Sequence, residues 1–142
     1  MTKTQRTLAF AALAAATALA GSAHAETAGK RLALSNNYAG NSWRQAMLQS
    51  WAKVGDKAVA DGIVAAADTF TTADQEVPTQ AAQIQNPILQ GYDAIVINAA
   101  SPDALNGAVK AACDAGIVVV SFDGVVSEIG RASCRERVLT GV

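Results

Sequence analysis

Short apolar runs alternate along this chain with longer segments in which apolar residues recur every three or four positions. Four runs are mostly apolar, as parallel strands buried on both faces should be: residues 31–35, 63–67, 94–97 and 117–122. The periodic segments between them predict three helices. These run from Trp43 to about Asp61-Gly62, over residues 77–90, and from Ser101-Pro102-Asp103 to Gly116.

Each predicted helix has one apolar face. Pro78 fits the first turn of the second helix, whereas Pro87 should kink its last turn. Alternating strands and helices predict an α/β fold, an open parallel sheet in β-α-β-α-β-α-β order with helices on both faces. The apolar faces comprise Trp43, Met47, Trp51 and Val54; Ala81, Ile84 and Ile88; and Leu105, Ala108, Val109 and Ala112.

Residues 1–25 differ in composition from the rest. Lys3 and Arg6 precede a run of apolar and small residues over 8–20, and the triplet Ala23-His24-Ala25 follows. This is the pattern of a secretory signal peptide, so we predict cleavage after Ala25 and a periplasmic location. The alternative is a membrane anchor or a core helix, but the apolar run is short for a membrane span.

Composition excludes several classes of protein. Hydrophobic residues make up 51% and charged residues 16%, which excludes intrinsic disorder. Residues 26–128 hold six cations and eleven acids, a balance that argues against nucleic-acid binding. His24 is the only histidine and lies in the predicted signal peptide. Histidine-based triads and metal sites are therefore excluded from the mature chain, and we expect no cofactor.

The last fourteen residues, 129–142, look foreign to the protein. One reverse translation of residues 129–138 is the string of a common short-read sequencing adapter. The alternative is a genuine basic tail. If the segment is foreign, the natural sequence departs near Ser127 and Cys113 is the only true cysteine. We then expect Cys113 to be a buried small side chain rather than bridged to Cys134.

The ends of the predicted strands suggest where a ligand binds. In open parallel sheets, ligands bind beyond the carboxyl ends of the strands. Three loops lie there: residues 36–44, the loop that starts at Asn98, and Asp123-Gly124. They offer amides, one guanidinium, one carboxylate and an indole, which suit the hydroxyls and the C–H face of a sugar. Phosphate-binding glycine motifs are absent from the sequence.

Several motifs together resemble a known family. They are the asparagine-rich loop that runs into a helix, Q-G-Y-D-A-I-V-I-N before S-P-D-A-L, and G-I-V-V-V-S-F-D. From about residue 31 to 126 the chain is similar to the beginning of the periplasmic sugar-binding proteins of ABC importers, the group with the type I periplasmic binding fold that includes ribose-binding protein.

The resemblance implies a two-lobed monomer that closes over a sugar and delivers it to an ABC permease in the inner membrane. Residues 26–128 would then form part of the N-terminal lobe, after the signal peptide at 1–25 and before the foreign tail at 129–142. Because a sugar between two lobes would meet only half its partners in this chain, we expect the chain alone to bind sugar too weakly to measure.

Five positions are carried over from the resemblance as ligand-binding residues. Asparagines would bond hydroxyls, the tryptophan would stack on the sugar ring, and the aspartate would accept bonds from hydroxyls. The positions are Asn41, Trp43, Arg44, Asn98 and Asp123.

Two positions depart from the family pattern. Arg44 stands where the family often has a second aromatic residue, and Gly124 stands where ribose binders have an arginine. The glycine puts ribose itself in doubt, although Arg44 can supply the missing guanidinium.

Each of these residues also has a structural interpretation. Trp43 can be a core residue, Arg44 a solvated helix residue, and Asp123-Gly124 an ordinary turn. Asn41-Ser42 can cap the first helix, with Ser42 as the cap, and Asn98 can satisfy backbone groups of its loop.

Three other function classes compete with a sugar-binding transport protein. An exported enzyme lacks a nucleophile with its base in this sequence. The sensing domain of a repressor shares the fold, but the predicted signal peptide argues against it. A binding protein that reports to a chemoreceptor or sensor kinase is not separable from a transport protein by sequence.

The origin of the tail is testable by long-read sequencing of the gene across codons 120–142. We expect the reading frame to continue past Ser127 into a second lobe. A genomic sequence that ends as this one does would contradict that expectation and make the chain a degraded remnant.

Overall fold

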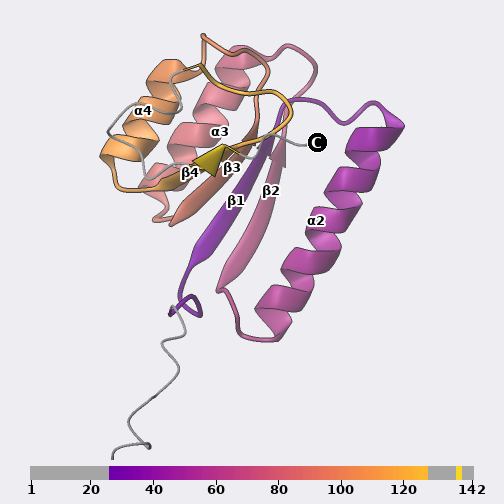
Figure 1. Ribbon diagram of the computed structural model, residues 1–142, viewed down its shortest axis with the longest axis vertical. Helices are drawn as coiled ribbons and strands as arrows, with labels where there is room; N and C mark the ends of the chain where they lie inside the picture. Colours follow the sequence, from indigo (N-terminus) through magenta and orange to yellow (C-terminus); the bar gives the residue numbers. More distant parts are fainter. Residues whose placement is uncertain (1–25, 128–136, 139–142) are drawn as a thin grey trace, which may run out of the picture.

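The computed structural model describes residues 26–127 and 137–138 and contains one parallel sheet with strand order β2-β1-β3-β4-β5 (Figure 1). The predicted open parallel sheet is therefore confirmed, with one additional strand. The strands are β1 (Arg31–Asn36), β2 (Ala66–Thr71), β3 (Ala94–Asn98), β4 (Val118–Ser121) and β5 (Arg137–Val138).

Helices cover both faces of the sheet, as predicted. Helices α3 (Val77–Leu89) and α4 (Asn106–Asp114) lie on one face, and α2 (Ser42–Ala60) lies alone on the other (Figure 1). Within the described residues, no helix is both long and apolar enough to cross a membrane.

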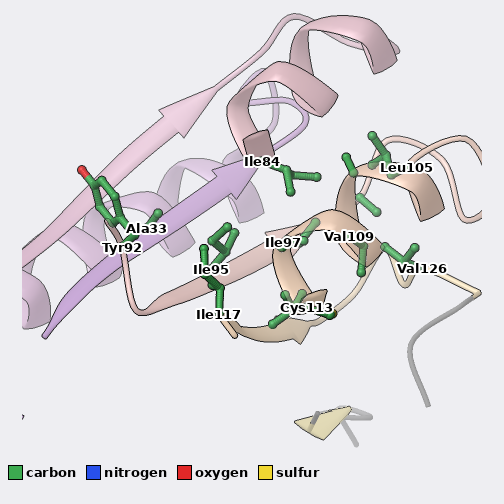
Figure 2. Packing of buried hydrophobic residues seen from close by; sticks show 14 residues of the cluster. Ala33, Ile84, Tyr92, Ile95, Ile97, Leu105, Val109, Cys113, Ile117 and Val126 are labelled. Atoms are coloured by element: carbon green, nitrogen blue, oxygen red, sulfur yellow. The ribbon is translucent and has the colours of Figure 1, made fainter. Parts of the chain in front are cut away.

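The core lies between the sheet and the helices α3 and α4. Ala33, Ile95 and Val119 are register partners across three strands, so their side chains point to the same face. All three are fully buried, and Figure 2 shows Ile84 and Val109 packed toward this row from the helices. The buried face predicted for the third helix is confirmed, because its members have almost no exposed surface: Leu105, Ala108, Val109 and Ala112.

The opposite face is less well filled. Leu34, Val96 and Val120 form the next row in register and point toward α2. With Trp51 and Phe122 they line an apolar groove of about 340 Å³. The apolar face predicted for this helix is only partly buried, because α2 packs mainly over β2 at the edge of the sheet.

Helix α2 approaches β2 most closely at Gly55, its only buried residue. A Cβ atom at Gly55 would lie 2.8 Å from the Cβ of Ala67. Val54 beside it is 68% exposed, contrary to its predicted place on the buried face.

The second strand begins three residues later than predicted, at Ala66 rather than residue 63. Ile63 and Val64 instead close the end of α2, where both backbone N–H groups donate to the carbonyl of Ala58, at 2.8 and 3.4 Å. The apolar residues that close the helix were therefore wrongly assigned to the beginning of the strand.

The third helix also begins later than predicted, at Asn106. The hydroxyl of Ser101 does accept a hydrogen bond from the N–H of Ala104 at 3.2 Å, but this closes a separate turn. Helix α3 contains Pro87 in its interior, and the kink predicted there stays a prediction.

Two features concern the end of the chain. Strand β5 falls in the segment expected to be foreign, and its Arg137 pairs with Val120 of β4. Cys113 is disulfide-bonded, so the expectation of an unbridged thiol is wrong. Cys134, the only other cysteine of the sequence, lies outside the described residues, as do the predicted signal peptide and most of the tail.

An ion pair joins the amino ends of β1 and β3. Asp93 accepts hydrogen bonds from the ammonium group of Lys30 at 2.8 Å and from the backbone N–H of Arg31 at 2.9 Å. These two hydrogen bonds hold the pKa of Asp93 below its usual value of about 3.8. The same two hydrogen bonds join β1 to β3 at the amino ends of the strands, which is the edge of the sheet opposite the candidate site.

Replacing Gly55 with alanine tests the close approach of α2 to the sheet. In a helix, alanine is more favourable than glycine by about 1 kcal/mol. Gly107→Ala in α4 is the control and should show this increase in stability, because no atom lies within 4 Å of its added methyl group. We expect Gly55→Ala to be about 1–3 kcal/mol less stable than Gly107→Ala because of overpacking against Ala67. Urea denaturation measures both, and equal stabilities would contradict the contact.

The Asp93 pair predicts a pH dependence of stability. Because the folded state lowers the pKa of Asp93, its contribution is present above the unfolded value and is lost as the pH falls through the folded value. Asp93→Asn should therefore flatten the fall of the urea midpoint below about pH 4. Asp56→Asn, on the exposed side of α2, controls for removal of one negative charge; identical profiles for the two variants would contradict the prediction.

Candidate functional site

Polar side chains gather where β1, β3 and β4 end. Asn36 is the last residue of β1 and Asn98 the last of β3, and the two are register partners. Both are fully buried. Asp123 follows β4 at the same edge, so the three strands deliver two amides and a carboxylate to one place.

Three of the five predicted ligand-binding residues meet there through hydrogen bonds. The carboxylate of Asp123 accepts from the amide Nδ2 of Asn98 at 3.1 Å and from Nη2 of Arg44 at 3.4 Å. The Asp123 side chain is 49% exposed, whereas that of Arg44 is 13% exposed. The carboxylate therefore faces outward and the guanidinium lies beneath it, which contradicts the interpretation of Arg44 as a solvated helix residue.

The turn after β4 is held tightly against the end of β3. Asp123 has a φ of 55°, in the left-handed region that aspartate tolerates better than most residues. The N–H of Ala99 donates to the carbonyl oxygen of Gly124 at 2.8 Å. A Cβ atom at Gly124 would lie 2.9 Å from the Oδ1 of Asn98 and inside contact distance of the Ala99 carbonyl.

This close approach gives a physical reason why position 124 holds a glycine rather than the arginine of ribose binders. A side chain at this position would collide with the backbone that follows Asn98. Arg44 instead brings a guanidinium to Asp123 from α2.

Trp43 lies at the start of α2 with its indole 52% exposed, so the interpretation of Trp43 as a core residue is wrong. The guanidinium carbon of Arg44 lies 5.9 Å from the ring centroid. Trp51 is the half-buried indole of the same helix and lines the apolar groove instead.

Asn41 caps α2. Its side-chain Oδ1 accepts a hydrogen bond from the N–H of Arg44 at 2.8 Å, so Asn41 and not Ser42 is the N-cap. This bond orients the first turn that carries Trp43 and Arg44. Asn41 thus acts on the first turn of α2, and among the described residues no hydrogen bond joins its side chain directly to Asn98 or Asp123.

Sequence reasoning missed two buried amides that support this edge. Asn36 bonds to Arg44, and Gln80 of α3 bonds to the backbone that leaves β3: its Nε2 donates to the Asn98 carbonyl at 2.9 Å and its Oε1 accepts from the Ala100 N–H at 2.8 Å. The sequence did hold a signal for Asn36, because it ends an apolar strand just as Asn98 does. Gln80 carried no signal, because a glutamine in a helix is ordinarily exposed.

The arrangement offers hydrogen-bond donors and acceptors beside an exposed aromatic face. Over residues 26–127, no three histidine, cysteine, aspartate or glutamate side chains gather closely enough to hold a metal ion. The charged groups of the site, Arg44 and Asp123, pair with each other. Such a site suits a neutral ligand that presents hydroxyl groups.

Gly124→Ala should disturb the site from its backbone. The added methyl group has no space against Ala99, so we expect the free energy of unfolding to fall by about 1–3 kcal/mol. Gly29→Ala is the matched control, because no atom lies within 4 Å of its added methyl group. Urea denaturation compares the free energies of unfolding of the two variants. Equal values would mean that the turn at Gly124 can move away from β3 without cost, which would contradict the prediction.

Known proteins share this fold. Residues 32–134 match the periplasmic binding protein domain. An ABC transporter solute-binding protein from Thermobispora bispora is 38% identical, with a TM-score of 0.66, over 69% of this chain and 31% of that protein. One from Clostridium phytofermentas with bound L-rhamnose is 26% identical, with a TM-score of 0.55, over 70% and 30%.

The Caulobacter myo-inositol-binding protein shares the fold at 20% identity, with a TM-score of 0.57, over 75% of this chain and 33% of that one. This chain thus spans about a third of the length of these structures. No curated protein sequence matches it significantly. The matched family comprises solute-binding proteins rather than enzymes, and its name places it in the periplasm. Since the match covers most of the chain, this protein belongs to the periplasmic binding protein domain family.

Proposed function

We propose that this chain is the N-terminal part of the solute-binding component of an ABC importer, and that the complete protein binds a monosaccharide or a related polyol. The observation that carries the proposal is the hydrogen-bonded group of Arg44, Asn98 and Asp123 at the carboxyl edge of the sheet. Its half-exposed carboxylate accepts hydrogen bonds, and the indole of Trp43 lies exposed beside the guanidinium.

The chemistry of the site supports a neutral, hydroxyl-rich ligand. The pairing of Arg44 with Asp123 leaves no net charge between them to attract an ion. Carboxylate and amide groups make directional bonds to hydroxyls. Related solved structures hold D-allose, L-rhamnose and myo-inositol, which share this chemistry.

We propose a role for each of the five residues. Asp123 and Asn98 bond ligand hydroxyls, and Arg44 supplies further donors from beneath. Trp43 packs its indole against the ring of the ligand. Asn41 orients the first turn of α2 through its bond to the Arg44 N–H, and in the complete protein its amide also bonds a ligand hydroxyl.

The proposal extends to the setting of the protein. Residues 1–25 direct export to the periplasm, where the protein acts as a monomer without catalysis and passes its ligand to an ABC permease. Residues 129–142 are foreign to the natural protein. A second lobe follows in the complete protein and supplies the other half of the ligand's partners, so that residues 26–128 alone do not bind sugar measurably.

Calorimetry on the full-length gene product, with D-allose, D-ribose, L-rhamnose and myo-inositol as probes, tests the function. We expect one of these sugars or polyols to bind. Trp43→Ala should weaken that binding about tenfold or more, because it removes on the order of 2 kcal/mol of apolar contact.

Trp51→Phe is the control, since this half-buried indole lines the apolar groove between α2 and the sheet and is not part of the hydrogen-bonded group of Arg44, Asn98 and Asp123. It should leave affinity unchanged. Binding of none of the probes would contradict the proposed ligand class. Equal affinities of the Trp43→Ala variant and the natural protein would contradict the stacking role.

A further inference from the structure

Asn36 lies beneath the site and does not face its opening. It ends β1, is fully buried, and has Asn98 as its register partner on β3. Its side chain is nevertheless linked to the candidate ligand-binding residues through the guanidinium of Arg44, eight residues further along the chain.

Two hydrogen bonds of opposite kind fix the orientation of this amide. Its Oδ1 accepts from Nη1 of Arg44 at 2.9 Å, and its Nδ2 donates to the backbone carbonyl of Tyr38 at 2.7 Å. Reversing the amide would place a donor against a cation and an acceptor against a carbonyl. An aspartate would likewise set an oxygen against the Tyr38 carbonyl, so an asparagine satisfies both partners where its charged analogue does not.

The guanidinium is thereby held between two oxygens. Nη1 donates to Asn36 from one side and Nη2 to Asp123 from the other. A guanidinium has five N–H donors, so these two bonds to described side chains account for two of them. With the side chain only 13% exposed, the direction of those donors depends on its two oxygen partners.

We propose that Asn36 is a positioning residue of the ligand site: it sets the Arg44 guanidinium against Asp123 and aims the remaining N–H donors at the ligand. This inference rests on the proposed sugar-binding function, because Arg44 can be positioned for a ligand only if a ligand binds at this site. Asn36 itself touches no ligand and acts through Arg44.

The binding test is a double-mutant cycle on the full-length gene product, with D-allose, D-ribose, L-rhamnose and myo-inositol as probes. A hydrogen bond to a charged group contributes enough that Asn36→Leu should weaken binding about ten- to a hundredfold. In an Arg44→Met background the same substitution should change affinity by less than about threefold, because the group it positions is gone. Equal losses in both backgrounds would overturn the inference.

Thr72→Val is the matched control. Thr72 is a buried polar residue near the end of β2, and its hydroxyl bonds the carbonyls of Asn37 and Ala73 rather than the guanidinium. It should lower stability without lowering affinity. A loss of affinity like that of Asn36→Leu would mean that any buried polar substitution at this edge disturbs binding, which would overturn the specific role.

A second measurement needs no ligand. NMR exchange of the Arg44 guanidinium N–H protons should be slow in the natural protein and at least about tenfold faster in Asn36→Leu. Unchanged exchange would overturn the inference whether or not a sugar binds. Accelerated exchange together with no binding of any probe would show that Asn36 holds the Arg44 guanidinium in place, but it would overturn the proposed function and with it the role in a ligand site.

Discussion

The pairing of β1 with β3 is the interaction on which the rest of the structure depends. Because these strands are parallel and in register, Asn36 and Asn98 end at the same level of the sheet. Asn98 then bonds the carboxylate that follows β4, and Asn36 bonds the guanidinium that comes from α2. A shift of one residue between the two strands would turn one amide to the opposite face and separate the two halves of the site.

The two faces of the sheet are stabilised unequally. The face beneath α3 and α4 has a continuous core of fully buried residues, including Ile84, Ile95 and Leu105. The face beneath α2 keeps an apolar groove, and among the described residues the indole nitrogen of Trp51 is buried without a hydrogen-bond partner. Gln80 bonds the candidate site from the first face, while α2 contributes Trp43 and Arg44 from the second.

Hydrophobic periodicity predicted the element types, the parallel sheet and the buried face of α4. It succeeded there because the spacing of apolar residues within one element shows which side of that element is buried. It misplaced the start of β2, because Ile63 and Val64 cap a helix through backbone bonds that any residue can make. Strand ends and family resemblance predicted the candidate positions Arg44, Asn98 and Asp123, which hydrogen bonds join in the structure. Asn36 and Gln80 were missed because their partners are distant in sequence and only the folded register brings them together.

The position of Arg44 in α2 has a consequence for the electrostatics of the first turn of this helix. A cation in the first turn of a helix is opposed by the positive end of the helix dipole, and α2 has no acidic residue of its own in that turn. The carboxylate of Asp123 supplies the missing negative charge from across the sheet. One carboxylate therefore acts on two positive charges: it pairs with the Arg44 guanidinium, and it lies near the positive end of the helix that carries this residue.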